Sequence, residues 1–67
     1  MDYTIIRVTE EPTFNDGNPG SDMRVEFKVG ASGPFYERFR KADFTRFAVE
    51  QRLGDFAREL KLLMPHL

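Results

Sequence analysis

The chain of 67 residues contains no cysteine. A disulfide, a thiolate metal site and catalysis by a cysteine nucleophile are therefore excluded. Histidine is almost as scarce, because the single His66 lies next to the last residue, where we expect no ordered site. Neither Ser21 nor Ser32 lies in a nucleophile elbow, and no nucleotide-binding or zinc-protease motif is found. We therefore predict that the protein is not an enzyme, with no catalytic residue, no metal and no cofactor.

Long apolar runs are also missing, and no segment is long enough to cross a bilayer. Residues 1–8, MDYTIIRV, include an acid and only a very short apolar run, which is unlike a signal peptide or an anchor. An excess of one charge is absent too, since the formal net charge is −1, and this gives no global signal for nucleic acid. These features predict a cytoplasmic protein that does not contact a membrane.

The short length limits how much surface the fold can bury. A chain of this size forms one domain, 1–67, which hides only about 60 % of the surface that the unfolded chain exposes. Without disulfides, additional stability would come from a partner or from self-association. A homodimer is therefore one of the states that we expect.

The sequence does contain one long periodic stretch, residues 42–65. Apolar side chains recur there at the spacing of one helical face, namely Val49, Leu53, Phe56, Ala57, Leu60, Leu63 and Met64. Asp43 or Thr45 can cap the first turn and a proline ends the stretch, which predicts a helix over about 43–64. Gly54 lies inside this helix at a cost of about 1 kcal/mol relative to Ala, which indicates either close packing or a tolerated exposed glycine.

Three segments before the helix have the residue types of β-strands. β-Branched residues predict a first strand over about 3–10, with Ile6 and Val8 pointing inward. Strict alternation of apolar and charged residues predicts a second strand over about 22–29. The inward residues of this second strand are Met23, Val25, Phe27 and Val29. A third strand is predicted over about 34–40.

The connections and the third strand complete the fold prediction. The segment 11–21 is rich in Pro, Gly, Asn and Asp, which predicts a loop. In the third strand Glu37 falls between two inward phenylalanines, Phe35 and Phe39. Either this strand is a short edge strand from which Glu37 reaches solvent past the helix, or a bulge reverses the facing of one half. Phe44 and Phe47 are expected to close the end of the core.

These elements predict an α+β fold, a three-stranded antiparallel β-meander packed on one C-terminal α-helix in the order β-β-β-α. The side of the sheet that the helix leaves uncovered would then be a candidate binding face. Its members are Arg7, Arg24, Lys28, Tyr36, Arg38 and Arg40, with Tyr3, Ile5 and Thr9 expected to point the same way. Glu26 is the one carboxylate expected among them.

A face of this kind can bind nucleic acid, because Arg and Lys contact phosphates and aromatic rings stack on bases. The arrangement resembles plant AP2-type and phage-integrase arm-binding domains, which lay a three-stranded sheet backed by a helix into the DNA major groove. That resemblance implies DNA binding, but it concerns the fold alone, since the chain has none of the sequence signatures of these families. The alternative is a solvated face with weak cross-strand ion pairs.

Acidic residues gather near the predicted loop, and they are Glu10, Glu11, Asp16 and Asp22. A calcium loop starting at Asp16 would need Gly at its sixth position and Glu at its twelfth, where the chain has Ser21 and Phe27. We therefore interpret the segment as an acidic contact loop, opposite in sign to the candidate binding face.

We predict a small non-enzymatic binding or adaptor domain that acts through protein–protein contact or self-association. DNA binding through the basic side of the sheet is the alternative. Leu62 and Leu67 lie off or beyond the apolar stripe of the helix, and exposed leucines at a helix end can mark an interface. Small domains of this shape are frequent among phage and prophage gene products, which makes such an origin a further hypothesis.

Overall fold

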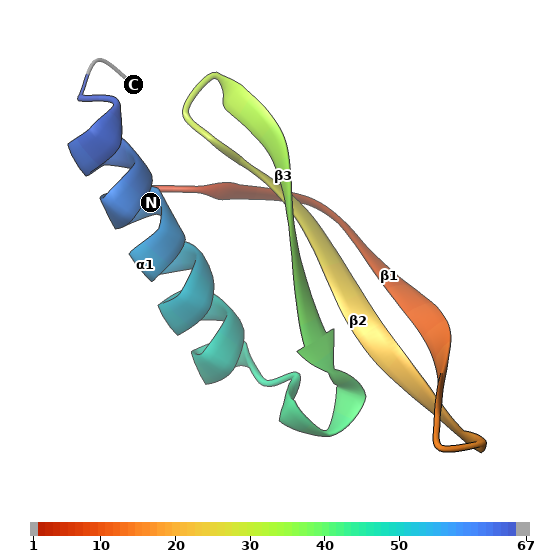
Figure 1. Cartoon of the computed structure of the whole chain (residues 1–67). Coiled ribbons are helices and arrows are strands. Elements are labelled where there is room, and N and C mark those ends of the chain that lie inside the picture. Colours follow the sequence, from red (N-terminus) through yellow and green to blue (C-terminus); the bar gives the residue numbers. More distant parts are fainter. Residues whose placement is uncertain (1, 66–67) are drawn as a thin grey trace.

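The computed structural model describes residues 2–65, which form one sheet and one long helix (Figure 1). The strands are β1 (Thr4–Asn15), β2 (Asn18–Val29) and β3 (Ser32–Arg40), and they are antiparallel in the order β1-β2-β3. A short 3₁₀ turn, η1 (Lys41–Asp43), leads into the helix α1 (Arg46–Leu63), which lies against one face of the sheet. The predicted α+β fold, β-β-β-α, is confirmed.

The helix begins and ends close to the predicted positions. Thr45 is its N-cap, because the Thr45 hydroxyl accepts a hydrogen bond of 3.1 Å from the backbone N–H of Ala48. Of the predicted stripe, Val49, Leu53 and Ala57 are buried and Phe56 and Leu60 are partly buried. Leu63 and Met64 are exposed, contrary to the prediction, because the last turn of α1 runs beyond the residues that pack on the sheet.

The core lies between α1 and the strands β2 and β3. Val25, Phe27 and Val29 are fully buried, which confirms the alternation predicted for the second strand. Phe39 of β3 is buried beside them. Phe27, Phe35 and Phe56 form an aromatic cluster in which the ring centroids are 5.0 to 5.9 Å apart. The helix is therefore held by a small group of aromatic and aliphatic side chains.

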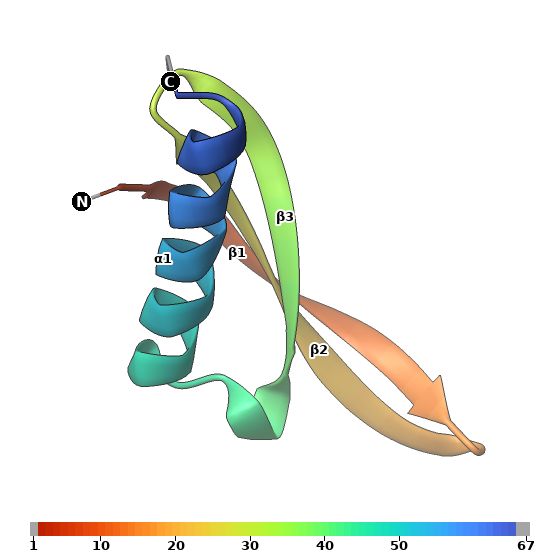
Figure 2. The same cartoon turned by 60° about the vertical axis from the view of Figure 1, so that its left-hand side comes forward.

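The segment predicted as a loop, 11–21, is a β-hairpin instead. β1 continues to Asn15 and β2 starts at Asn18, so only two residues connect them. Both have positive φ, 52° at Asp16 and 79° at Gly17, which is the geometry of a type I′ turn. The hairpin projects beyond α1 and the last residue of β3 (Figure 2), and it lengthens the molecule to 45 Å by 20 Å by 18 Å. We call residues 12–21 the hairpin arm.

A β-bulge at Ile6 changes the facing of β1. Ile5 pairs with Phe27 and Arg7 pairs with Glu26, which leaves Ile6 as the extra residue. Side chains before the bulge therefore change sides, so that Ile5 shares the helix side with Phe27, and Tyr3 is buried rather than outward. The prediction that both point outward was wrong.

Ile6 and Val8 were predicted to point inward, and the facing of Val8 is confirmed, but neither side chain is buried. Val8 pairs with Val25 and so faces the helix side, but Ile5, Ile6 and Val8 are 42 to 45 % exposed. The reason is that α1 packs over β2 and β3, so most of β1 lies outside its cover.

The remaining predictions concern Glu37 of the third strand and two phenylalanines that follow this strand. Glu37 pairs with Val25 and lies on the helix side, where a carboxylate oxygen is 3.8 Å from the Arg52 guanidinium of α1. No bulge is needed at this position, because β3 is an edge strand from which Glu37 reaches the side of the helix. Phe44 packs on Phe39 with ring centroids 5.9 Å apart, but Phe47 is 75 % exposed and does not close the core.

Candidate binding surfaces

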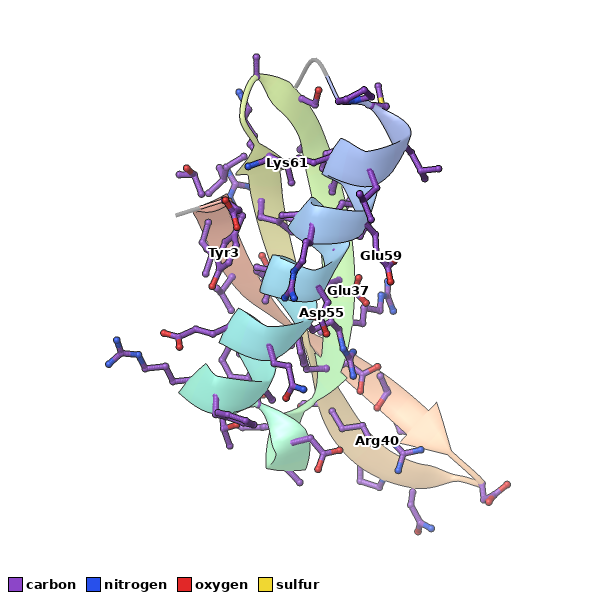
Figure 3. All side chains as sticks on the ribbon, turned by 90° about the vertical axis from the view of Figure 1, so that its left-hand side faces the viewer. Tyr3, Glu37, Arg40, Asp55, Glu59 and Lys61 are labelled. Atoms are coloured by element: carbon purple, nitrogen blue, oxygen red, sulfur yellow. The ribbon has the colours of Figure 1, made fainter. Side chains whose placement is uncertain are left out.

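The register of the strands brings the predicted binding residues to one side of the sheet. Arg24 pairs with Arg38, Glu26 pairs with both Arg7 and Tyr36, and these pairs face away from α1. We call the set the basic face, and it consists of Arg7, Arg24, Lys28, Tyr36, Arg38 and Arg40. Figure 3 labels Arg40 at the end of β3, beyond the first turn of the helix.

The basic face carries more acid than the sequence indicated. Because β1 continues through Glu11 and β2 already includes Asp22, these two carboxylates join Glu26 on this side, which gives three carboxylates against five cations. An oxygen of Glu11 lies 3.2 Å from the guanidinium of Arg38, although that oxygen is buried without a well-aligned hydrogen bond. The guanidinium of Arg24 stacks 4.9 Å from the ring centre of Tyr36. Two of the five cations, Arg38 and Arg24, therefore already contact other side chains of this face.

The predicted acidic contact loop does not exist as one surface. Glu10 pairs with Met23 and faces the helix side, whereas its neighbour Glu11 faces the other side. Glu10 accepts a hydrogen bond of 3.1 Å from Lys41, and this bond, together with one from Ser21, holds the pKa of the Glu10 carboxyl below its usual range. The acids of this segment are therefore divided between two faces and partly neutralised.

A groove runs between the start of β1 and the first half of α1. Its volume is about 800 Å³, within the range of ligand and peptide sites. The residues that line it are Tyr3, Thr4, Ile5, Phe44, Thr45, Arg46, Val49 and Glu50. We call it the β1–α1 groove, and the label of Tyr3 in Figure 3 marks its β1 side. It exists because α1 does not extend over β1.

The polar groups at the rim of the groove pair with each other. Arg46 donates a hydrogen bond of 2.8 Å to Glu50, one helical turn away, and this bond raises the pKa of Arg46. The floor consists of Tyr3, Ile5 and Val49, so its surface is mainly apolar. Such a site can hold the apolar side chains of a partner, and it presents no charged group of one sign to select an ion.

A surface ion pair fixes the start of β1 near this groove. The ammonium group of Lys61 lies 3.0 Å from a carboxylate oxygen of Asp2, which links the N-terminal end to the last turns of α1. This hydrogen bond and the charge of Lys61 lower the pKa of Asp2. The pair therefore joins the start of the chain to the C-terminal half of α1, outside the residues that line the groove.

The C-terminal end of α1 is a second apolar surface. Leu62 and Leu63 are about four-fifths exposed, as the sequence indicated for Leu62, whereas Leu67 lies outside the described residues. Gly54, further back in the helix, has no heavy atom within 4 Å of the position that a Cβ would occupy. Within the described chain, close packing does not explain this glycine.

No family model, curated protein or solved structure matches this chain. Among residues 2–65 no group of three or more His, Asp or Glu side chains could hold a metal ion, and His66 is outside this range. No helix of the described part is long and apolar enough to cross a membrane.

The sequence predicted the basic face but not the groove. The alternation of β2 and β3 is regular enough to assign their outer residues, whereas the groove depends on the bulge at Ile6 and on where α1 lies across the sheet. The adjacent Ile5 and Ile6 interrupt the alternation of β1, but this pattern alone does not show which of them is the extra residue of a bulge.

Proposed function

We propose that this protein is a small binding domain that recognises protein partners through the β1–α1 groove. The observation that supports this is an apolar groove of about 800 Å³ beside exposed apolar side chains of β1 and α1. Ile5 lines the groove, Ile6 and Val8 follow it in β1, Phe47 follows the lining residue Arg46 in α1, and these last three have exposed fractions of 42 to 75 %. Exposed apolar groups that cluster around a concave site are typical of interaction surfaces.

The free energy available from this site fits a binding role. Moving the exposed half of an Ile or Val side chain out of water contributes on the order of 1 kcal/mol. Three such side chains and the larger Phe47 would contribute several kcal/mol before the entropy of association is subtracted. The affinity that remains after this subtraction is that of a reversible complex.

Paired baits test this proposal. Immobilised wild type, Ile5→Lys and Arg38→Glu proteins are incubated with an extract of the source cells, and the retained proteins are compared. We expect one or more partners to bind wild type and Arg38→Glu but not Ile5→Lys, since the added charge would lie in the apolar groove. Partners that are lost with Arg38→Glu and retained with Ile5→Lys would contradict the proposal. Circular dichroism of each bait checks that it is folded.

A second candidate function, binding of duplex DNA, is supported by the basic face. Among the described residues Arg7, Lys28 and Arg40 form no ion pair and lie on one side of the sheet, so they could contact phosphates. If five cations contacted phosphates, the logarithm of the binding constant would fall with the logarithm of salt concentration with a slope of about −4.5. Binding that is absent at low salt, or unchanged in the double variant Arg24→Glu, Arg38→Glu, would rule this function out.

A further inference from the structure

The two edges of the sheet differ in how they are protected. At the β3 edge the carbonyl of Arg38 accepts a hydrogen bond of 2.9 Å from Arg52, and Glu37 pairs with the same guanidinium. At the β1 edge no side chain within residues 2–65 bonds to the backbone of the strand. An edge strand leaves half of its N–H and C=O groups unpaired, and charged or covering side chains usually block it. The β1 edge between Thr4 and Val8 is instead largely apolar.

The molecule also exposes more surface than a monomer of its mass normally does. A folded monomer of 7.8 kDa has an accessible surface of about 4,400 Å², whereas this chain exposes 5076 Å². The radius of gyration is 13.5 Å, compared with about 11 Å for a compact domain of 67 residues. The projecting hairpin arm contributes to this excess, which is of the order that one partner buries in a standard protein–protein interface, about 800 Å².

We propose that the groove is occupied by a second copy of this chain, which pairs with it through β1 in an antiparallel manner around a twofold axis. The proposal rests on the function assigned to the groove above and names its occupant. It would convert two three-stranded sheets into one of six strands, with α1 of both copies on the same face. The unpaired backbone groups of both β1 edges would then be satisfied.

The bulge at Ile6 makes β1 self-complementary. Residues that are directly opposite each other in an antiparallel pair share a face, and the bulge reverses the facing once in each copy. If the twofold axis passes next to Ile6, the bulges of the two copies lie side by side. Residues that are opposite each other then point to the same face of the sheet on both sides of the axis. With the axis just before Ile6, Val8 of one copy lies opposite Tyr3 of the other, and with the axis just after Ile6 it lies opposite Ile5. Both pairs are on the helix side.

This pairing fills the groove without bringing like charges together. Tyr3 and Ile5 line the groove, so Val8 of the second copy would cover its floor. On the other face Thr4 would lie opposite Arg7 or Thr9, and no two residues of like charge are opposite each other between Thr4 and Thr9. The half-exposed apolar side chains of β1 would be buried between the two helices.

Sedimentation of the intact chain over a range from about 1 to 500 µM tests the inference. We expect the mass to rise from 7.8 kDa toward twice that value. Val8→Lys should weaken association by at least about tenfold, whereas Leu62→Lys, a matched change at another exposed apolar residue, should leave it unchanged. If Val8→Lys does not fold, Val8→Thr keeps the shape of the side chain and tests the same contact by a smaller shift in the same direction.

Amide hydrogen exchange identifies the interface independently. Amides of β1 between Thr4 and Thr9 should be protected at high concentration and should exchange on dilution, while the β3 edge should not change. A monomer at every concentration overturns this inference alone and leaves the Ile5-dependent capture of partners as the test of the proposed function. A dimer that Leu62→Lys disrupts and Val8→Lys does not would place the interface at the end of α1 and would also overturn it.

Discussion

At the scale of single residues, Gly54 is a position where the chain is less stable than it could be. It lies within α1, and a Cβ added there would meet no heavy atom within 4 Å. We expect Gly54→Ala to raise the free energy of unfolding by about 1 kcal/mol, because alanine lowers the entropy of the unfolded chain and favours the helix. Urea unfolding measured by circular dichroism checks this value. A loss of stability would indicate that another molecule packs closely on Gly54 in solution.

The core depends on a few side chains, of which Leu53 is the most informative. It is fully buried against the sheet, whereas Leu62 in the same helix is 80 % exposed. We expect Leu53→Ala to cost about 2 to 5 kcal/mol, which is a large part of the stability of a domain of this size. Leu62→Ala should change the free energy of unfolding by less than about 0.5 kcal/mol. Equal effects of the two substitutions in urea unfolding would show that the assigned core is wrong.

At the scale of the elements, two ion pairs join segments that are distant in sequence, and they make stability depend on pH. Asp2 is bonded to Lys61 and Glu10 to Lys41, and each bond lowers the pKa of the carboxyl in the folded state. A carboxyl with a lowered folded pKa stabilises the fold above its unfolded pKa and loses this contribution as the pH falls. Stability should therefore decrease as the pH drops below about 4, the ordinary range of these groups.

The two pairs can be separated by NMR titration of the carboxyl carbons. Lys61→Gln should raise the pKa of Asp2 toward its ordinary value and leave Glu10 unchanged, and Lys41→Gln should raise the pKa of Glu10 and leave Asp2 unchanged. If both carboxyls already titrate at ordinary values in the wild type, these contacts do not form in solution.

The elements also show which features the sequence could predict. The helix and the central strand follow from periodicity, because Val25, Phe27 and Val29 alternate strictly and Thr45 caps the helix. The hairpin arm differs from the prediction because its Pro and Gly residues are typical of loops, whereas Asp16-Gly17 is a typical type I′ turn sequence that joins two strands. The prediction for β1 failed for a different reason.

In β1 the facing of side chains depends on tertiary structure. Whether Tyr3 and Ile5 point inward or outward depends on the one extra residue, Ile6. The alternation of residue types does not show where the register between β1 and β2 shifts. The basic face could therefore be predicted from β2 and β3, where the register is regular. The groove could not, because it lies where α1 leaves part of β1 uncovered, and the position of α1 depends on the contact of its Phe56 with Phe27 of β2 and Phe35 of β3.

At the scale of the whole molecule, the extended shape and the thin core have one consequence that can be measured. Eight residues of the described chain form the buried apolar core, while Ile5, Ile6 and Val8 stay half exposed. If a second copy covers these side chains, only the folded dimer gains their burial, and mass action links stability to concentration.

Thermal unfolding should therefore shift with protein concentration. We expect the midpoint of wild type to rise by several degrees between about 5 and 500 µM, since about 1 kcal/mol corresponds to roughly 4–8 °C in a domain of this size. The midpoint of Val8→Lys should depend less on concentration than that of wild type, because the added charge would be buried in the paired strands. A wild-type midpoint that stays constant over the same range would show that the chain folds without a second copy and would contradict the proposed pairing.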